Sequence, residues 1–244
     1  MRILQAIRRN IPNAITCLNL VAGVMACIYA TQGDRMIGPV NGYQGVFIMI
    51  ACAAVFDFCD GLAARLLRTV SAMGKELDSL CDTVSFGVAP AMMVYTLFET
   101  ADGASPLKYV ALLIAVCGVL RLARFNVDTT QSTSFLGMPI PANAIFWIGY
   151  VSWQWQHPGT LAGCGLWVMA AVTVFISLLM VCRLRMFSLK FKDFGLANNW
   201  HRYLIIVAAI VLIALQGLTG LASTIVAYIL LSALTHRRTK AHEA

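Results

Sequence analysis

Four aspartates are the residues in this sequence best suited to chemistry, because they lie in apolar surroundings at helical spacing. Asp57 and Asp60 are three residues apart, and Asp78 and Asp82 are four apart. Side chains at those spacings share one face of an α-helix. A carboxylate within a membrane-spanning helix is costly unless it is paired or binds a cation. Each helix is therefore predicted to present one functional acidic stripe.

The two acidic stripes are predicted to face each other, because only the short connection at residues 68–74 joins the two helices. Carboxylates gathered at low dielectric repel one another, and divalent cations remove that repulsion. An all-oxygen ligand set favours Mg²⁺ or Mn²⁺, with Ca²⁺ also suitable, over zinc. Four aspartates can hold one or two ions that bridge phosphate oxygens. For a single aspartate, the alternative is a solvated helix end or a salt bridge to Arg65, Arg68 or Lys75.

Small residues accompany the acids and are predicted to let a large polar ligand approach the backbone closely. They are Gly61, Ala63, Ala64 and Gly74. Arg65 follows one helical turn after Gly61, where it can meet an anionic phosphate or balance the acidic cluster.

The composition places these helices in a membrane. Of the 244 residues, 59% are apolar and 12% charged, against roughly half and a quarter in soluble domains. Apolar stretches of about 20 residues, enough to cross the hydrocarbon core, recur along the chain. We predict an all-α integral membrane protein with about eight transmembrane helices, at residues 13–31, 43–67, 75–98, 107–125, 138–156, 161–182, 203–217 and 219–235.

The basic residues predict the orientation of these helices, since short cytoplasmic loops carry excess Lys and Arg. With the N-terminus inside, every one of the 18 basic residues except Arg35 and Lys108 falls on the cytoplasmic side. Both termini and the acidic cluster are then cytoplasmic, in a bacterial-type cell membrane. Topology and anionic lipid headgroups explain the net charge of +7, so no nucleic-acid partner is expected. The alternating basic and aromatic residues of segment 183–202 predict a helix on the membrane surface.

The aspartates belong to a longer pattern that resembles the signature of the CDP-alcohol phosphotransferase family. Every defined position is occupied: Asp57-x2-Asp60-Gly61-x2-Ala64-Arg65-x8-Gly74-x3-Asp78-x3-Asp82. The resemblance implies a core of six membrane helices, a homodimer, and a cytoplasm-facing cavity in which a CDP-linked lipid binds over one or two divalent ions. We place this catalytic core at residues 1–200, and two C-terminal transmembrane helices with a basic cytoplasmic tail at residues 201–244.

The family resemblance also implies roles for single residues. Asp57, Asp60 and Asp78 become metal ligands, while Asp82 both borders the metal and is the candidate general base. The expected CDP-lipid site comprises Gly61, Ala64, Arg65 and Gly74, with Thr16 and Asn19 from the first span.

A second motif is similar to the phosphatidylserine synthase branch of the family. It consists of Arg121-Leu122-Ala123-Arg124-Phe125-Asn126 and then Phe135-x-Gly137-Met138-Pro139-x-Pro141. This resemblance implies L-serine as the acceptor, with Arg121, Arg124 and Asn126 as candidate acceptor-binding residues. Alternatively, the arginines mark a cytoplasmic helix end, and the prolines mark a helix start.

The implied reaction is transfer of a phosphatidyl group from CDP-diacylglycerol to L-serine, giving phosphatidylserine and CMP. A serine hydroxyl is a poor nucleophile near neutral pH, so a carboxylate such as Asp82 must take its proton. The same chemistry with glycerol 3-phosphate or an inositol compound is the main alternative. Intramembrane aspartates also suit an ion transporter, although no repeats or acids spread across the bilayer depth support it. A structural scaffold leaves the four aligned aspartates unexplained.

Overall fold

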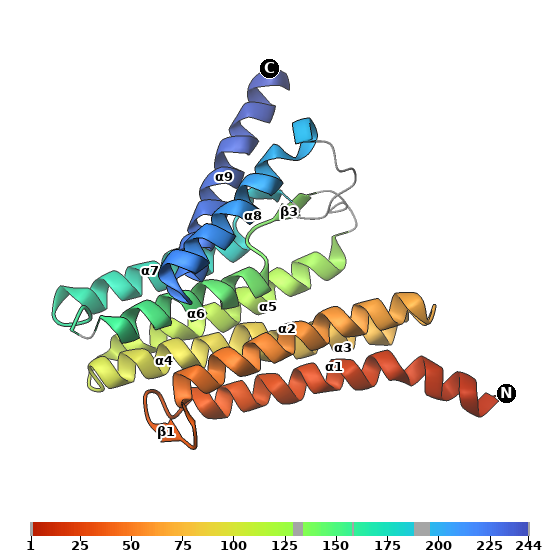
Figure 1. The fold of residues 1–244 in the computed structure, drawn as a ribbon, viewed down its shortest axis with the longest axis horizontal. Helices are drawn as coiled ribbons and strands as arrows, with labels where there is room; N and C mark the ends of the chain where they lie inside the picture. Colours follow the sequence, from red (N-terminus) through yellow and green to blue (C-terminus); the bar gives the residue numbers. More distant parts are fainter. Residues whose placement is uncertain (1, 129–133, 158, 188–195, 244) are drawn as a thin grey trace. The chain divides into compact units, whose positions relative to one another are not determined.

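The computed structural model describes residues 2–128, 134–157, 159–187 and 196–243, most of them in helices (Figure 1). The chain forms two compact units, residues 1–122 and 123–244, each of which is described by itself.

The first unit is a bundle in which helix α1 has a central place. Its elements are α1 (Arg2–Ala30), a hairpin of β1 (Met36–Ile37) and β2 (Val40–Asn41), α2 (Gly42–Leu66), α3 (Ala72–Asp82), a π-helical segment (Thr83–Val88), α4 (Ala89–Ala101), a 3₁₀ turn (Pro106–Ala111) and α5 (Leu112–Val127), which continues into the second unit. Helix α1 packs along α2 and also contacts α3, the π-helical segment and α4. The two acid-bearing helices therefore share α1 as a neighbour.

The turn between α2 and α3 is built from local hydrogen bonds. Arg68 adopts a left-handed conformation with φ 53°, and the N–H of Thr69 donates to the carbonyl of Ala64 at 2.9 Å. This pattern closes a helix C-terminus and reverses the chain. Ser71 then caps α3, since its Oγ accepts from the N–H of Gly74 at 3.0 Å. The turn thereby sends α3 back along the bundle and fixes where its aspartates begin.

Helix α1 approaches its neighbours closely at two glycines, one on α1 itself and one on α2. A Cβ on Gly45 of α2 would overlap the ring of Tyr29, and a Cβ on Gly23 of α1 would overlap the backbone and hydroxyl of Ser85. Close packing through small residues is typical of membrane helices. It seats the π-helical segment directly on α1.

In its described residues, the second unit contains the end of α5, four further helices and one short antiparallel pair of strands. Its elements are β3 (Ser134–Leu136), α6 (Ile140–Gln156), α7 (Cys164–Val181), β4 (Arg185–Phe187), α8 (Leu196–Gln216) and α9 (Thr219–Glu243). Helix α9 packs against both α6 and α8, and α8 turns into α9 at Gly217, where φ is 60°.

The expected surface helix at residues 183–202 needs a correction at its start. Arg185–Phe187 is an extended strand that pairs antiparallel with Ser134–Leu136, with Leu136 opposite Arg185. Backbone pairing with a partner strand satisfies the polar groups that a surface helix would satisfy internally. The expected residues 188–195 lie outside the described part of the chain, and Leu196 already begins α8.

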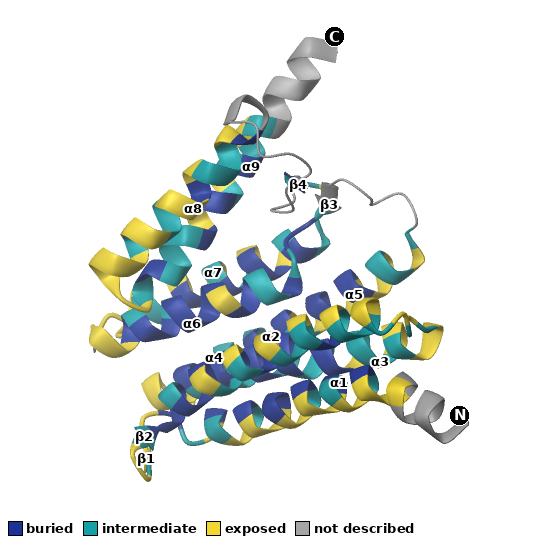
Figure 2. Ribbon diagram, turned by 45° about the vertical axis from the view of Figure 1, so that its right-hand side comes forward, coloured by how far each residue is buried: buried dark blue, intermediate teal, exposed yellow. Residues whose placement is uncertain are grey.

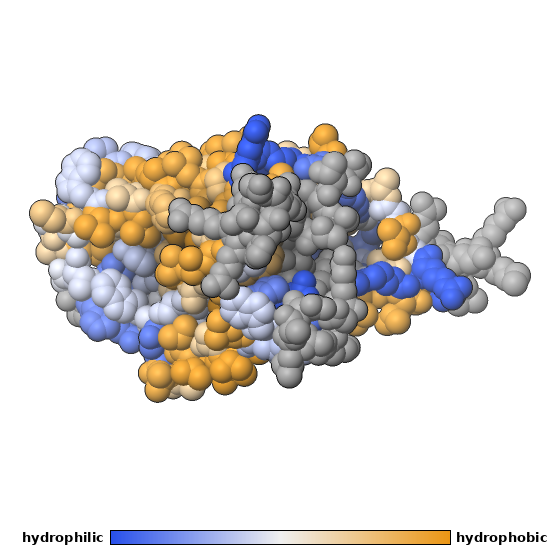
Figure 3. All heavy atoms as spheres, turned by 90° about the horizontal axis from the view of Figure 1, so that it is seen from above, coloured by the Kyte–Doolittle hydropathy of each residue, from blue (hydrophilic) through white to orange (hydrophobic). Residues whose placement is uncertain are grey.

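The expected all-helical membrane fold is confirmed. Within the described residues, six helices are long and apolar enough to cross a membrane. The remaining two expected spans correspond to α6, of 17 residues, and to the apolar part of α9, Thr219–Thr235. Much of the face drawn in Figure 3 is apolar. Helix α8 exposes most of its length (Figure 2), and only 11% of its apolar segment Asn199–Gln216 is buried. Such a surface suits a lipid environment.

Candidate metal centre

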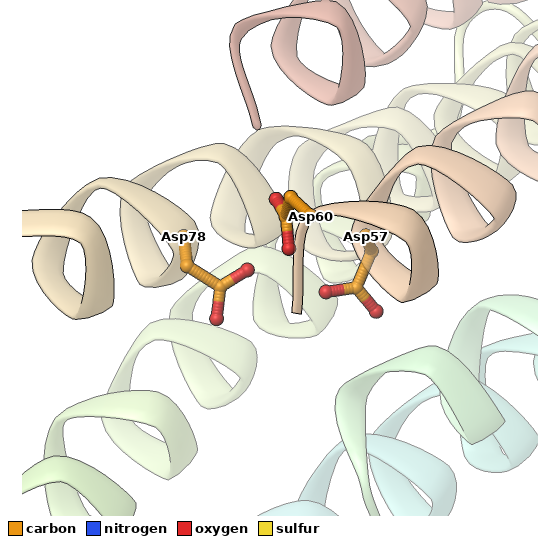
Figure 4. Close-up of side chains that lie close together, drawn as sticks. All are labelled: Asp57, Asp60 and Asp78. Carbon is orange, nitrogen blue, oxygen red and sulfur yellow. The ribbon is translucent and has the colours of Figure 1, made fainter. Parts of the chain in front are cut away.

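Three of the predicted aspartates converge in the first unit. Asp57 and Asp60 project from the C-terminal part of α2, and Asp78 projects from α3. Each offers a carboxylate oxygen, and these oxygens all lie within 4.8 Å of one another. Figure 4 shows the three side chains pointing into a common space. The helical spacing of the sequence therefore produces the predicted cluster across two helices.

The oxygens of this cluster fit a hard divalent cation. Asp60 is buried, with 6% of its surface exposed, and its Oδ2 atom has no hydrogen-bond partner among the described residues. The Oδ1 atom of Asp78 is also buried and has no hydrogen-bond partner among the described residues. Buried carboxylate oxygens without donors are strongly unfavourable unless a cation binds them. The chain thus supplies oxygen ligands of the kind that Mg²⁺ and Mn²⁺ prefer.

A pocket of about 240 Å³ lies beside the cluster. Helices α1, α2 and α3 and the connecting turn all contribute to it. Its lining is Pro12, Asn13, Thr16, Asp60, Gly61, Ala64, Thr69, Val70, Ser71, Gly74, Lys75 and Asp78. The structure therefore brings four residues of the predicted CDP-lipid site, namely Thr16, Gly61, Ala64 and Gly74, next to two of the acids.

The two signature glycines differ in what surrounds them. A Cβ on Gly61 would meet nothing nearer than the Arg65 guanidinium at 3.8 Å, so protein packing leaves this side of the pocket open. A Cβ on Gly74 would lie 3.3 Å from Asn13 Oδ1 and 3.2 Å from Ser71 Oγ, a tight fit. Gly61 leaves space for a ligand, whereas Gly74 lets α3 approach α1.

Arg65 is exposed and binds its own helix. Its Nε–H donates to the carbonyl of Gly61 at 2.9 Å, so the guanidinium is anchored beside Gly61, a residue of the pocket lining. The predicted contact of Arg65 with a phosphate is not tested by this geometry and stays a prediction.

Asp82 is the last residue of α3, one helical turn after Asp78. It is 8% exposed, and its Oδ1 accepts a hydrogen bond of 3.0 Å from the amide of Asn19. Asn19 itself is completely buried and does not line the pocket described above. The structure thus shows Asn19 contacting Asp82, while its predicted contact with the CDP-lipid stays a prediction.

The sequence interpretation overlooked Asn13 and Ser71 as parts of the pocket. Asn13 follows Pro12 one turn before Thr16, whose hydroxyl donates to the Pro12 carbonyl at 3.0 Å. The i, i+3 spacing of Asn13 and Thr16 on α1 was the available signal. Ser71 could have been found as a polar cap at the start of the second acidic helix.

The candidate acceptor residues lie on α5, at the boundary of the two units. Arg121 is buried with 9% exposure, and Asn126 is half-buried. Arg124 is exposed, and its Nη1 donates to the carbonyl of Val181, the last residue of α7, at 2.9 Å. A cation at a helix C-terminus stabilises the unpaired carbonyls there. Arg124 therefore has an architectural contact, and acceptor binding stays a prediction for all three residues.

The glycine and prolines after this helix build a helix start. Gly137 has φ 77°, and its N–H donates to the Leu184 carbonyl at 2.9 Å. Pro139 precedes α6 and Pro141 is in its first turn, where a missing N–H costs nothing. The structure supports the helix-start interpretation of this motif.

Comparison with known proteins points to one family. Similar proteins that carry the name CDP-diacylglycerol–serine O-phosphatidyltransferase include the following three. The protein of Mycobacterium leprae is 39% identical over 64% of this chain and 50% of its own length. That of Mycobacterium bovis is 34% identical over 82% and 68%, and that of Bacillus subtilis 37% identical over 54% and 69%.

The matched part of these relatives is thus half to about two thirds of their length. The sequence model of the CDP-alcohol phosphatidyltransferase family matches residues 9–179, which include the acidic cluster, its pocket and the α5 arginines. On this match the chain belongs to the CDP-alcohol phosphatidyltransferase family.

Proposed function

We propose that this protein transfers the phosphatidyl group of CDP-diacylglycerol to L-serine, giving phosphatidylserine and CMP. The observation that carries the proposal is the convergence of Asp57, Asp60 and Asp78 beside a pocket. The names of the similar proteins support serine as the acceptor.

The three carboxylates would hold one or two divalent ions, Mg²⁺ or Mn²⁺. Such an ion neutralises phosphate charge and orients a phosphoryl centre for in-line attack. The chain's own contribution is positional, since α2 and α3 fix the carboxylates. Asp82 would be the fourth acidic residue of the metal site and would lie at its border.

Asp82 is the residue we assign as general base. A base must lie within hydrogen-bond reach of the attacking hydroxyl and must be held in one orientation. The Asn19 amide donates to one oxygen of Asp82 at 3.0 Å. This hydrogen bond holds the carboxylate in one orientation. Asp82 would take the proton of the serine hydroxyl as the new phosphorus–oxygen bond forms and the bond to CMP breaks.

The pocket beside the acids would receive the cytidine and pyrophosphate of the lipid substrate. Gly61 leaves open space there, and Thr16, Ala64 and Gly74 form adjacent walls. Arg65, one turn away on α2, would contact a phosphate oxygen. These residues are the CDP-lipid site in this proposal, together with Asn19 behind them.

The acceptor would be recognised by the guanidinium groups of α5. Arg121 or Arg124 would pair with the carboxylate of serine, with Asn126 as a further polar contact, and this pairing would reject neutral alcohols. Replacement of either arginine is expected to raise the KM for serine without changing that for CDP-diacylglycerol.

The remaining organisation is proposed from the charge pattern and the family. Within the first unit, Lys108 and Glu99 form an ion pair of 2.6 Å at the start of the 3₁₀ turn, an end of the bundle that we assign to the outside. Both termini and the acidic cluster would face the cytoplasm of a bacterial-type cell. Residues 1–200 would be the catalytic core and residues 201–244 an addition to it, in a homodimer.

The direct test uses purified protein, CDP-diacylglycerol and Mn²⁺ with a panel of acceptors, and follows CMP. We expect CMP release with serine, little with glycerol 3-phosphate or inositol, and none after chelation of the metal. Asp82→Asn should abolish turnover while binding of the CDP-lipid remains detectable. Full activity in the presence of chelator, or CMP release with glycerol 3-phosphate alone, would contradict the proposal.

A further inference from the structure

A chain of buried hydrogen bonds leads away from the proposed base. The amide nitrogen of Asn19 donates to Asp82 Oδ1 at 3.0 Å. The hydroxyl of Ser85 lies 2.6 Å from Asn19 Oδ1 and 3.0 Å from the Asn19 backbone carbonyl. Both Asn19 and Ser85 are completely buried. The three side chains therefore form a polar relay, of which only Asp82 is partly exposed.

The direction of each bond in the relay follows from what the groups can donate. A carboxylate only accepts, so the amide NH₂ of Asn19 must face Asp82 and its Oδ1 must face the other way. That oxygen needs a donor, and the Ser85 hydroxyl is the donor within reach. Rotation of the amide by half a turn would set two acceptors against each other at Asp82, so the carboxylate decides which way the amide faces. The Ser85 hydroxyl, by donating to Asn19 Oδ1, holds the amide in that place.

The backbone around Ser85 is held in place independently. Ser85 lies in the π-helical segment that begins directly after Asp82, and the N–H of Ala89 donates to the carbonyl of Val84, five residues earlier. Gly23 of α1 allows the Ser85 backbone to approach so closely that a Cβ would overlap it. Segments of π-helix inside α-helices occur frequently at functional sites. Here the segment places a hydroxyl against α1 three residues beyond the base.

We propose that Ser85 is a positioning residue that acts through Asn19 to hold the Asp82 carboxylate in its productive orientation. The inference rests on the proposed function, because it assumes that Asp82 takes the proton of the acceptor. It goes beyond that function by assigning a role to a serine outside the aspartate signature, and by making Asn19 part of the support of Asp82.

The test compares Ser85→Ala with Asn19→Ala and with the double variant, using CMP release from CDP-diacylglycerol and serine. Loss of an outer support of a catalytic or metal-binding group is expected to cost about 10- to 100-fold in kcat. The KM for CDP-diacylglycerol should stay within about twofold, because Ser85 does not line the pocket. In the Asn19→Ala background, Ser85→Ala should cause no further loss, since residues acting as one chain are non-additive.

The second readout is the affinity for Mn²⁺, measured by calorimetry without substrate. We expect Ser85→Ala to bind Mn²⁺ like the wild type, because the Asp57, Asp60 and Asp78 oxygens are not held by Ser85. Ser177→Ala is the matched control, since Ser177 is also fully buried and its hydroxyl has no partner among the described residues. It should keep the wild-type kcat.

Three results would overturn the relay. They are a wild-type kcat in Ser85→Ala or in Asn19→Ala, additive losses in the double variant, and a loss of Mn²⁺ affinity that parallels the loss of kcat. If Ser85→Ala does not fold, the kcat of Asn19→Ala still tests the relay, because Asn19 is the link between Ser85 and Asp82. Absence of CMP release from the wild-type protein would instead contradict the proposed function, so the two failures are distinguishable.

Discussion

Two regions of the molecule carry polar motifs that were predicted to act on substrates, and they use their polar atoms differently. In the first unit, Asp60 and Asp78 each present a buried oxygen without a hydrogen-bond partner among the described residues. In the second unit, Arg124 donates to the Val181 carbonyl and Gly137 donates to the Leu184 carbonyl. The acids keep hydrogen-bond acceptors without a donor. The groups of the second unit instead donate to backbone carbonyls.

For charged groups, this difference distinguishes a ligand site from an architectural site by a physical criterion. A buried acceptor without a partner is unfavourable by a few kcal/mol, on the order of 1–3, unless something outside the chain binds it. A donor placed on the last carbonyls of a helix lowers the energy of the folded chain by itself. The acidic cluster therefore requires a further component, and the helix-end contacts of the second unit do not.

The largest expected effect is at the acidic cluster. Asp78→Asn removes a charged ligand oxygen, and we expect CMP release to fall by more than about 100-fold, beyond the loss typical of an outer support. Folding should be maintained, because the substitution removes repulsion between carboxylates. Asp102→Asn is the control: Asp102 is exposed and accepts from the Ala104 N–H in a loop. Equal activities of the two variants would contradict a ligand role for the acidic cluster.

Gly137→Ala should affect stability rather than chemistry. The residue has φ 77°, and an added Cβ would overlap the Met180 carbonyl. We expect a loss of about 2 kcal/mol or more in the free energy of unfolding. Gly159→Ala is the matched control, since Gly159 has φ 96° with open space around it. Equal losses for the two variants would show that conformation alone, without the contact to α7, sets the cost.

Arg124→Ala is expected to have a smaller effect. Loss of its hydrogen bond to Val181 should lower the free energy of unfolding by about 1 kcal/mol, measured by denaturation in detergent. Arg35→Ala, at an exposed arginine of the β1–β2 hairpin, provides the comparison. The proposed contact with serine predicts in addition a higher KM for serine in Arg124→Ala, and an unchanged KM would leave Arg124 with its architectural contact alone.

The smallest effect is expected at the turn between α2 and α3. Arg68 holds φ 53°, which costs an L-residue roughly 1–2 kcal/mol relative to glycine. Arg68→Gly should therefore raise the free energy of unfolding by up to about 1 kcal/mol, since glycine also gains freedom in the unfolded chain. A lower stability of Arg68→Gly would show that the arginine side chain, and not the backbone, maintains this turn.

Helical spacing and apolar span length predicted most of what positions the site. The i, i+3 and i, i+4 spacing of the aspartates and the short connection at residues 68–74 were sufficient to predict the cluster. The roles of α1 and of the turn before α3 were less visible, because Asn13 on α1 and Ser71 in the turn carry no charge and are common as cap or turn residues. Ser85 was overlooked since its contact with Asn19 spans 66 positions of sequence. Local periodicity does not report such pairings.

The strand at Arg185–Phe187 shows a second limit of sequence patterns. Its alternating basic and aromatic residues suit both a surface helix and an extended strand, because the choice depends on a partner. That partner is Ser134–Leu136, about 50 residues earlier, and neither strand is long enough to be recognised by itself.

The most direct test of the central claim is the position of a bound cation. Crystals of the protein grown with Mn²⁺ would give an anomalous difference map that locates the ion without assumptions about the reaction. We expect a peak within coordination distance, about 2.0–2.6 Å, of carboxylate oxygens from Asp57, Asp60 and Asp78. A map with no peak among these three residues, at Mn²⁺ concentrations that saturate catalysis, would contradict the account.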